Sequence, residues 1–419
     1  MISTNLAWPG FVRNHDASGV VDAHIETVRH GEGRLDHTLT LRVSRRAGSE
    51  HIQQIRFAVD APFEVPDLRT ADPFLIAALF PAMEVGGTLR LHGTISRVLL
   101  RNVFDYQSAW FRAAPHMFRP FELQVEAISD DVQRDFGPRP NAILAFSGGM
   151  DSLLALHRNI SGDAGEAAYS VGATMFLPGM ARKNPSAESK AALVAGMRAM
   201  SGRRNLPMAV VDTNISDIVG KQFVTHGTWL ASCMSLFSGR FDVGLLGSSV
   251  AAYSQGYEIY GSHPFLDPFL SGGQMEIRND EGLFERPDKA FLLARYPEAL
   301  ADLRTCFHYY GNNRNCCRCE KCIRSMLCFI ATGNEIPSSF PDGLDLKDIG
   351  IGMGRRSGLE WAPLLLESAE AHGVRDHPAM RRLRRRYHQK RLKIMAKNGL
   401  RRVTGREKRS RWSVIDEMG

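Results

Sequence analysis

The chain has 419 residues, 44% of them hydrophobic and 23% charged, with a formal net charge of +7. This length exceeds what one hydrophobic core usually organises, so two or three domains are expected. No stretch approaches the roughly 18 to 20 apolar residues of a membrane span, and the first residues lack the basic flank and apolar run of a signal peptide. A soluble, cytoplasmic protein is therefore expected.

The first part of the chain has the pattern of β-strands. Residues 1–128 contain alternating apolar and polar segments such as HTLTLRVSRR, HIQQIRFAVD and GTLRLHGTISRVLL. A period of two is typical of strands with one face toward water. We therefore expect a β-rich accessory domain over residues 1–128. The polar segment DDVQRDFGPRPN contains two prolines and predicts a linker over residues 129–141.

The central part of the chain has a different pattern. Residues 142–335 alternate short apolar runs (NAILAF, AYSVGATMF, MAVVD, FDVGLLG) with segments of helical period (DSLLALHRN, SAESKAALVAGMRAM, GTWLASCMSLFSG). Strands that alternate with helices indicate an α/β domain with a parallel sheet and flanking helices.

The carboxyl end, residues 336–419, is expected to be a helical, basic tail. Residues 381–411 contain fifteen lysines and arginines and one acid, Glu407, so this segment carries +14 and the rest of the chain 7 − 14 = −7. This imbalance excludes a protein built throughout to coat nucleic acid. Two interpretations stay open for the tail, which are contact with the phosphate backbone of a nucleic acid and a solvated helix. Few aromatic residues accompany the charges, so base stacking has little support.

A glycine-rich loop follows the strand NAILAF. Gly148 and Gly149 allow close backbone approach, and the start of the next helix offers unpaired N–H groups and the positive end of a dipole. Ser147 and Ser152 add hydroxyl donors, whereas Asp151 is suited to holding Mg²⁺ or orienting the loop. No Walker A lysine follows. The sequence therefore predicts phosphate binding here, the alternative being a turn that caps an ordinary helix.

The run SGGMDS resembles the SGGxDS signature of the PP-loop ATP pyrophosphatases, which split ATP into AMP and pyrophosphate. The resemblance implies a HUP/PP-loop parallel sheet with ATP and Mg²⁺ as cofactors. It also implies that the strand after the loop helix borders the adenine and that a second loop, after FDVGLL, reaches the phosphates. The ATP-binding residues expected from it are Ser147, Gly148, Gly149, Met150, Asp151, Ser152, Thr174, Met175, Phe176, Gly247 and Ser248.

Five of the seven cysteines lie within seventeen positions. Cys306, Cys316, Cys319 and Cys322 have the spacing of a tetrahedral, structural Zn²⁺ site. The alternatives are an iron-sulfur cluster and free buried thiols. Cys317 is a spare thiol. The odd total in a chain without a leader also favours a metal and a reducing compartment over disulfides.

The loop and the cysteines together resemble the QueC-like branch of the PP-loop superfamily over about residues 141–335. The cysteine repeat is similar to the C…CGxCxxC motif of that branch, with Cys317 at the position of the glycine. In this family ATP adenylates 7-carboxy-7-deazaguanine, ammonia then gives an amide, and a second activation yields a nitrile. Three features depart from the simple biosynthetic enzyme, which are the long amino-terminal region, the segment after Gly247 and the basic tail.

Polar residues around the divergent segment are candidates for substrate contact. His263 and Asp267 in GSHPFLDP, and His226 before the helix through Trp229, have suitable polarity, although turn geometry or a helix cap would also explain them. Arg286 and Lys289 lie one turn apart at an expected helix start, where they would face an α-phosphate or form a solvated surface. The expected catalytic set is Asp151, Ser152, Lys289 and Arg286.

Extended QueC-like proteins occur beside antiviral defence operons and peptide-modification clusters. The resemblance therefore implies an AMP-forming ligase that activates a small carboxylate, a 7-deazaguanine acid, and joins it to an amine on a protein or peptide. Two alternatives remain, namely a small-molecule nitrile or amide synthase and a tRNA-modifying PP-loop enzyme.

Overall fold

The structure is a computed structural model. It describes residues 1–4, 19–45, 49–132, 139–180, 186–249, 260–306, 315–351 and 356–403, without the side chains of Thr4 and Gln222 and of residues 356–360 and 397–403. The described chain divides into a first unit, Met1–Ser147 with Ala155–Leu283, and a second unit, Gly148–Leu154 with Phe284–Gly419.

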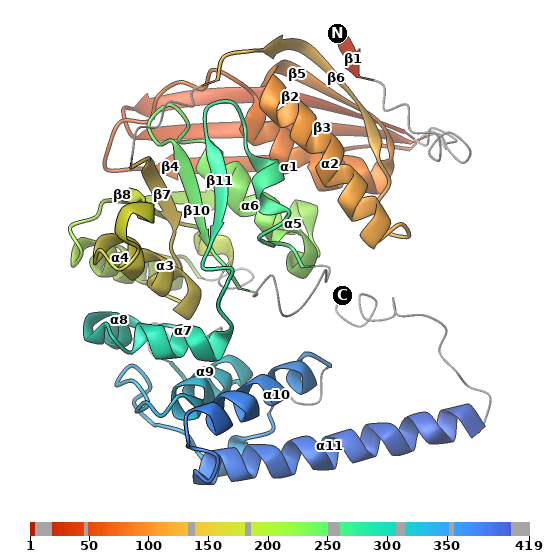
Figure 1. The fold of residues 1–419 in the computed structure, drawn as a ribbon. Helices are drawn as coiled ribbons and strands as arrows, with labels where there is room; N and C mark the ends of the chain where they lie inside the picture. Colours follow the sequence, from red (N-terminus) through yellow and green to blue (C-terminus); the bar gives the residue numbers. More distant parts are fainter. Residues whose placement is uncertain are drawn as a thin grey trace. The chain divides into compact units, whose positions relative to one another are not determined.

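The first unit contains an eleven-stranded sheet (Figure 1). Its strands are β1 (Ile2–Thr4), β2 (Gly19–Gly31), β3 (Arg34–Arg45), β4 (Glu50–Asp60), β5 (Gly87–Ser96), β6 (Phe121–Ser129), β7 (Asn141–Ala145), β8 (Ser170–Phe176), β9 (Met208–Thr213), β10 (Val243–Gly247) and β11 (Glu276–Asp280). They are arranged in the order β1-β6-β5-β2-β3-β4-β9-β8-β7-β10-β11. Six of the ten neighbouring pairs are parallel, so the protein is a mixed α/β structure with a mostly parallel sheet.

Helices cover both faces of this sheet. In the first unit they are α1 (Asp72–Val85), α2 (Arg97–Ala113), α4 (Ala187–Gly202), α5 (Ile215–Val219) and α6 (Gln222–Ser235). Helix α1 packs on β2, β3 and β5, and α6 packs on β7 and β10. Thirteen of the fourteen residues of α1 are buried, as expected for a helix that is apolar on all sides. Helix α4 lies on the opposite face, where its Ser201 meets Thr174 of β8.

One core joins the amino-terminal strands to the later parallel strands. Strand β4 pairs antiparallel with β9, with Phe57 opposite Thr213 and Asp60 opposite Val210. A single hydrophobic cluster runs from Val21 to Ile277. The expected accessory region 1–128 and the strands after residue 142 therefore belong to one sheet and one unit. Residues 133–138 of the expected linker lie outside the described residues.

The amino-terminal region also contains helices that the sequence pattern did not predict. The segment GTLRLHGTISRVLL was expected to be a strand throughout, but β5 ends at Ser96. The Ser96 hydroxyl accepts a hydrogen bond from the Leu99 amide at 3.1 Å and so caps α2. The prediction for residues 97–100 was therefore wrong, because a serine cap ends the strand.

The second unit is helical. It contains the first turn of α3 (Met150–Ile160), α7 (Arg286–Leu293), α8 (Pro297–Asp302), α9 (Glu320–Ala331), α10 (Arg356–Ala371) and α11 (Pro378–Val403). Helix α9 packs on α7, α10 and α11. The first turns of α11 bury Ala379, Met380 and Leu383, whereas most side chains from Arg385 to Ala396 are exposed. Residues 404–411 of the expected basic tail lie outside the described residues. In the described part of the chain, no helix combines the length and apolar character needed to cross a membrane.

Candidate functional site

The order of the parallel strands places a switch point between β7 and β10. Numbered along the chain, the strands β9-β8-β7-β10-β11 run 3-2-1-4-5, and all are parallel. In such sheets, ligands bind beyond the carboxyl ends of the strands where the order reverses. The chain leaves β7 at this point through Phe146 and Ser147, the start of the SGGMDS run. Strand β10 ends beside it at Gly247.

The loop has the backbone conformation that its glycines allow. Gly148 has φ +69°, a left-handed value that a side chain would disfavour. Helix α3 begins at Met150, and the Leu153 amide donates to the carbonyl oxygen of Gly149 at 2.9 Å. The Ser152 hydroxyl donates to the same oxygen at 3.3 Å. The loop therefore leads directly into a helix start, as the sequence predicted.

Asp151 lies beside the two cations expected from the sequence. Its Oδ2 accepts from Nη2 of Arg286 at 2.9 Å, and its Oδ1 accepts from Nζ of Lys289 at 3.4 Å. Both cations belong to the first turn of α7, which starts at Arg286. The Lys289 side chain is only 1% exposed, and the Asp151 carboxylate compensates part of its charge.

One further cation, Lys321, acts on Asp151, and a second, Arg324, acts on Lys321; neither was expected from the sequence. Burial by itself would raise the pKa of Asp151, but the charges of Arg286, Lys289 and Lys321 outweigh it, and the pKa is lowered from 3.8. Burial, together with repulsion by Arg286 and Arg324, lowers the pKa of Lys321 to about 7. Lys321 and Arg324 lie on the first turns of α9. This cluster contains more cations than carboxylates, so an anionic ligand would be favoured there.

Four cysteines form a compact cluster with the geometry of a metal centre. The Sγ atoms of Cys306, Cys316, Cys319 and Cys322 all lie within 4.8 Å of one another. Two of the separations, Cys306 to Cys319 and Cys316 to Cys322, are 3.9 Å. A tetrahedral Zn²⁺ ion with bonds of about 2.3 Å to sulfur separates its ligands by about 3.8 Å. The donor set and its spacing therefore fit Zn²⁺.

Backbone and amide groups support this cluster. The Cys319 amide donates to Sγ of Cys316 at 3.3 Å. The buried Asn315 side chain accepts from the amides of Thr305 and Cys306 and donates to the carbonyls of Leu303 and Ser339. Such contacts fix the orientation of metal ligands.

The spare thiol, Cys317, has a strained backbone. Its φ is +57°, in the left-handed region where glycine is preferred. Its side chain is buried, and its thiol lies 3.6 Å from the carbonyl oxygen of Asn315. The conformation explains why glycine would suit this position.

The cysteine cluster is connected to the loop within the second unit. The Arg304 amide, two residues before Cys306, donates to the carbonyl oxygen of Gly148 at 2.7 Å. Helix α9 begins directly after Cys319 and carries Lys321 between two of the cysteines. A metal that fixes the cysteines would therefore also fix the backbone beside Gly148 and the start of α9.

The residues expected to border the adenine are buried in β8. The Thr174 hydroxyl is 2.8 Å from the Ser201 hydroxyl, and Met175 belongs to the main hydrophobic cluster. The Met175 carbonyl accepts from the Phe146 amide at 2.8 Å. Phe176 is also buried. These contacts show packing roles for Thr174 and Met175, and contact with a base stays a prediction.

The expected second phosphate loop is tied to β11. Gly247 is the last residue of β10 and pairs with Asp280. The Ser248 amide donates to the carbonyl oxygen of Asp280 at 2.8 Å, and Ser248 is buried. This amide is therefore already used within the sheet, and its contact with phosphate also stays a prediction.

The expected substrate residues lie in one region of the first unit. The His226 ring contacts the Tyr260 ring edge to face at 5.0 Å, and the Gly227 amide donates to the Gly261 carbonyl oxygen at 3.0 Å. The sequence predicted that His226 precedes the helix. This prediction was wrong, because α6 begins at Gln222 and His226 lies within it.

The buried Asp267 carboxylate is held by hydrogen bonds from neighbouring residues. It accepts hydrogen bonds from the Ser262 hydroxyl, the His263 amide and the Asn279 side chain at 2.7, 3.0 and 2.6 Å. Burial raises its pKa to about 6 despite these bonds. His263 is buried, and its Nδ1 accepts from the Phe265 amide at 3.2 Å. These contacts organise the turn, and substrate contact stays a prediction.

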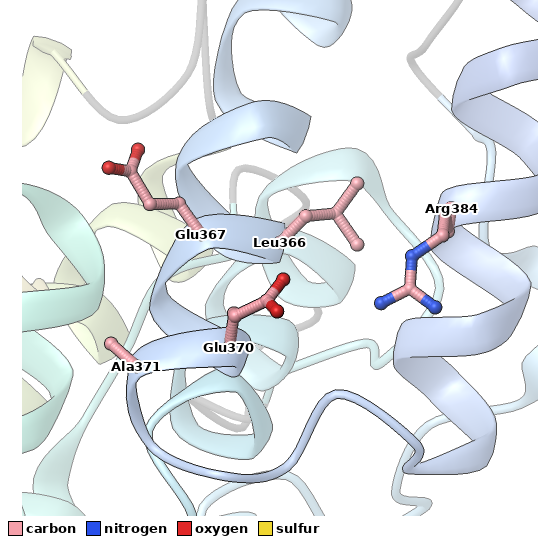
Figure 2. Close-up of a pocket in the computed structure, with 5 residues that line it drawn as sticks. All are labelled: Leu366, Glu367, Glu370, Ala371 and Arg384. Atoms are coloured by element: carbon pink, nitrogen blue, oxygen red, sulfur yellow. The ribbon is translucent and has the colours of Figure 1, made fainter.

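A cavity of about 500 Å³ lies between α10 and α11 in the second unit. Figure 2 shows its lining residues, which are Leu366, Glu367, Glu370, Ala371 and Arg384. Arg384 belongs to the basic segment 381–411, and none of the five is among the residues expected to bind ATP, substrate or metal.

Comparisons with protein-family models, curated proteins and solved structures each found no match to this chain. Its function is therefore inferred from its residues and their geometry.

Proposed function

We propose that this protein is an ATP-dependent, AMP-forming ligase that adenylates a carboxylate, a 7-deazaguanine acid, and joins it to an amine on a protein or peptide. The observation that carries the proposal is the SGGMDS loop. It follows β7 at the switch point of the sheet and leads to Asp151, which two cations of α7 contact.

The reaction begins with attack of a carboxylate oxygen on the α-phosphorus of ATP. The bond from this phosphorus to the bridging oxygen breaks, and pyrophosphate leaves. An amine then attacks the acyl carbon, AMP leaves with the bonding electrons, and an amide remains. Adenylation turns a poor electrophile into one with a good leaving group.

Cations at the loop would stabilise the charge that develops on the departing pyrophosphate. Arg286, Lys289 and Lys321 supply this charge in a partly buried setting, where electrostatic interactions are strong. Both oxygens of Asp151 already accept from cations, which favours an orienting role for Asp151 over a role as the Mg²⁺ ligand. Mg²⁺ would then bind chiefly through the phosphates of ATP, as it commonly does.

Zn²⁺ in the four-cysteine cluster would be structural. Four thiolates complete a tetrahedral shell and leave no position for water. The ion would hold the segment with Arg304 against Gly148 and fix the start of α9.

The test is the formation of pyrophosphate from ATP with 7-carboxy-7-deazaguanine as the acid. We expect acid-dependent pyrophosphate release that Arg286→Gln and Lys321→Met each reduce at least about tenfold, equivalent to about 1.4 kcal/mol of lost interaction. Arg295→Gln is the matched control, because Arg295 is exposed just beyond the end of α7. Zinc content is measured in each variant, since Lys321 lies between two cysteines.

Two results would contradict the proposal. One is the absence of pyrophosphate release with any acid or amine tested. The other is tight ATP binding without turnover, which would identify a nucleotide-binding module. An acid-dependent reaction that needs no macromolecular amine would instead support a nitrile or amide synthase.

Helix α11 favours a second candidate, in which the activated group belongs to tRNA. Most of its side chains from Arg385 to Ala396 are exposed and many are basic. The test replaces five basic residues of α11 with glutamine and keeps the buried Leu383; the five are Arg385, Arg386, Lys390, Arg391 and Lys393. If this candidate is correct, the native protein shifts the mobility of tRNA in a gel in a salt-sensitive manner, and the variant does not. Unchanged tRNA binding, or none in the native protein, would exclude it.

A further inference from the structure

The polar face of the sheet in the first unit holds a second cluster of metal-binding side chains. Asp22, His24 and His92 each offer one ligand atom, and these atoms all lie within 4.8 Å of one another. We propose that this cluster is a solvent-open site for a divalent transition metal, with two imidazoles and one carboxylate as ligands. The proposal does not depend on the proposed ligase activity.

Strand register brings these residues together. Asp22 and His24 are two residues apart on β2, so they point to the same face of the sheet. The neighbouring residues Val21 and Ala23 are buried in the core. Strand β5 runs parallel to β2 with Ala23 opposite Leu91, which places His92 beside His24 one residue further along. The cluster therefore lies on the face turned away from the core.

The distances place Asp22 between the two histidines. Its Oδ1 is 3.0 Å from Nε2 of His92, and its Oδ2 is 3.2 Å from Nε2 of His24. The two rings are stacked, with centroids 3.9 Å apart and planes 13° apart. Ligand atoms around a tetrahedral zinc ion lie about 3.3 Å from one another when the bonds are about 2.0 to 2.1 Å. A small rotation of the exposed His24 ring would bring both nitrogens toward one ion.

A second carboxylate orients His92. Oε1 of Glu126, on β6, lies 3.3 Å from Nδ1 of His92. An acceptor at one ring nitrogen keeps the proton there and leaves the other nitrogen free to bind a metal. The Nε2 atom that faces Asp22 is then the ligand. This arrangement of carboxylate, histidine and metal is common at metal sites.

The backbone at His92 is irregular. The pairing of β5 with β6 shifts register between Leu91 and Thr94. Bulges of this kind redirect side chains and are frequent beside functional sites. The shift occurs at the residue that must turn toward Asp22.

The ligand set determines the class of metal. Imidazole nitrogen with carboxylate oxygen suits Zn²⁺, Ni²⁺, Co²⁺ or Fe²⁺, in contrast to the four thiolates of the cysteine cluster. Three protein ligands leave coordination positions open, which is typical of catalytic rather than structural sites. Water or an oxygen ligand of a substrate would occupy these positions.

The experiment measures metal stoichiometry in the full chain with its cysteine cluster already loaded with Zn²⁺. Excess Co²⁺ is added, unbound metal is removed by equilibrium dialysis, and cobalt and zinc are counted by mass spectrometry. We expect one bound Co²⁺ per chain, with the weak visible absorption of nitrogen and oxygen ligands and no sulfur charge-transfer band. His24→Gln and His92→Gln should each reduce this occupancy at least about tenfold, while zinc content stays constant.

His30 provides the matched control. It is an exposed histidine on β2 whose Nε2 lies 2.9 Å from Oδ2 of Asp36, so it reproduces one histidine and carboxylate pair without a second histidine. His30→Gln should leave the cobalt count unchanged. No bound Co²⁺ in the native chain, or equal losses in the His30 and His92 variants, would overturn the proposal. Far-ultraviolet circular dichroism confirms that the variants are folded.

Discussion

The amide of Arg304 donates a hydrogen bond to the carbonyl oxygen of Gly148, with nitrogen and oxygen 2.7 Å apart. This contact links the segment that leads to Cys306 with the first glycine of the loop. The order of the cysteine cluster and the conformation of the loop are therefore coupled.

Under the proposed function, loss of a metal from the cysteine cluster should weaken ATP binding. We expect Cys319→Ser, or removal of zinc by a chelator, to raise the Kd for ATP by about tenfold, or about 1.4 kcal/mol, because the Arg304 contact and the start of α9 lose their support. Isothermal titration calorimetry measures the change. Cys317→Gly is the control and should keep zinc and affinity, since Cys317 has a φ of +57° and is outside the ligand set. Unchanged ATP affinity in zinc-free protein would contradict the coupling.

The carboxylate of Asp151 should stabilise the fold through Lys289. Asp151→Asn removes the negative charge beside the Lys289 ammonium group, whose side chain is 1% exposed. Removal of one partner of a buried ion pair costs about 3 to 5 kcal/mol in the free energy of unfolding. Denaturant unfolding gives this value. The double variant with Lys289→Met should recover at least half of the loss, because the buried Lys289 charge is removed together with its partner. Additive losses in the double variant would show that the pair is not coupled.

His37 should make stability depend on pH. Burial, with repulsion by Arg29, lowers its pKa from 6.5 to about 4, so protonation favours the unfolded chain. The stabilisation is present above pH 6.5 and is lost as the pH falls toward 4, at most by about 3 kcal/mol. Asp267 acts in the opposite direction, because its raised pKa favours the protonated folded state.

The His37 effect is therefore measured as a difference between proteins. Unfolding free energies of the native chain and His37→Gln are compared from pH 7 to pH 4.5, and the variant should lose less stability on acidification. His51→Gln, at an exposed position on β4, is the control and should follow the native curve. Parallel curves for the native chain and His37→Gln would refute the assignment.

Gly227 should not tolerate alanine. Within a helix this change usually stabilises by about 1 kcal/mol. A Cβ atom at Gly227 would, however, lie 2.0 Å from the carbonyl oxygen of Gly261, which is backbone and cannot move cheaply. We expect a net loss of about 1 to 3 kcal/mol in the free energy of unfolding. At Gly202, the last residue of α4, nothing lies within 4 Å, so Gly202→Ala should be neutral or stabilising. Equal effects at the two positions would disprove the contact.

The sequence predicted those helices and strands whose pattern lies within one short segment. The loop at Ser147 and the cysteine cluster at Cys319 could be found because their residues are closely spaced in the sequence. The alternation of strands with helices indicated the parallel sheet. Strand β11 was missed because EIRND is short and polar. The pairing of β4 with β9 joins residues about 150 positions apart, which no local pattern reports.

The charge cluster at Asp151 was only half predicted. Arg286 and Lys289 were found because they lie one turn apart at a helix start. Lys321 was overlooked because its neighbours Cys319 and Cys322 were interpreted only as metal ligands. Its position beside Asp151 depends on the packing of α7 against α9, which the spacing of residues does not reveal.

The pairing of β4 with β9 also has a consequence for solubility. Without β4, the edge of β9 would present unpaired N–H and C=O groups beside the apolar residues Val210 and Val211. A fragment that starts at Arg139 would keep the loop and the cysteines, but the unpaired edge of β9 would be free to pair with a strand of another chain. The amino-terminal strands therefore shield the parallel strands β9, β8, β7, β10 and β11 from edge-to-edge aggregation.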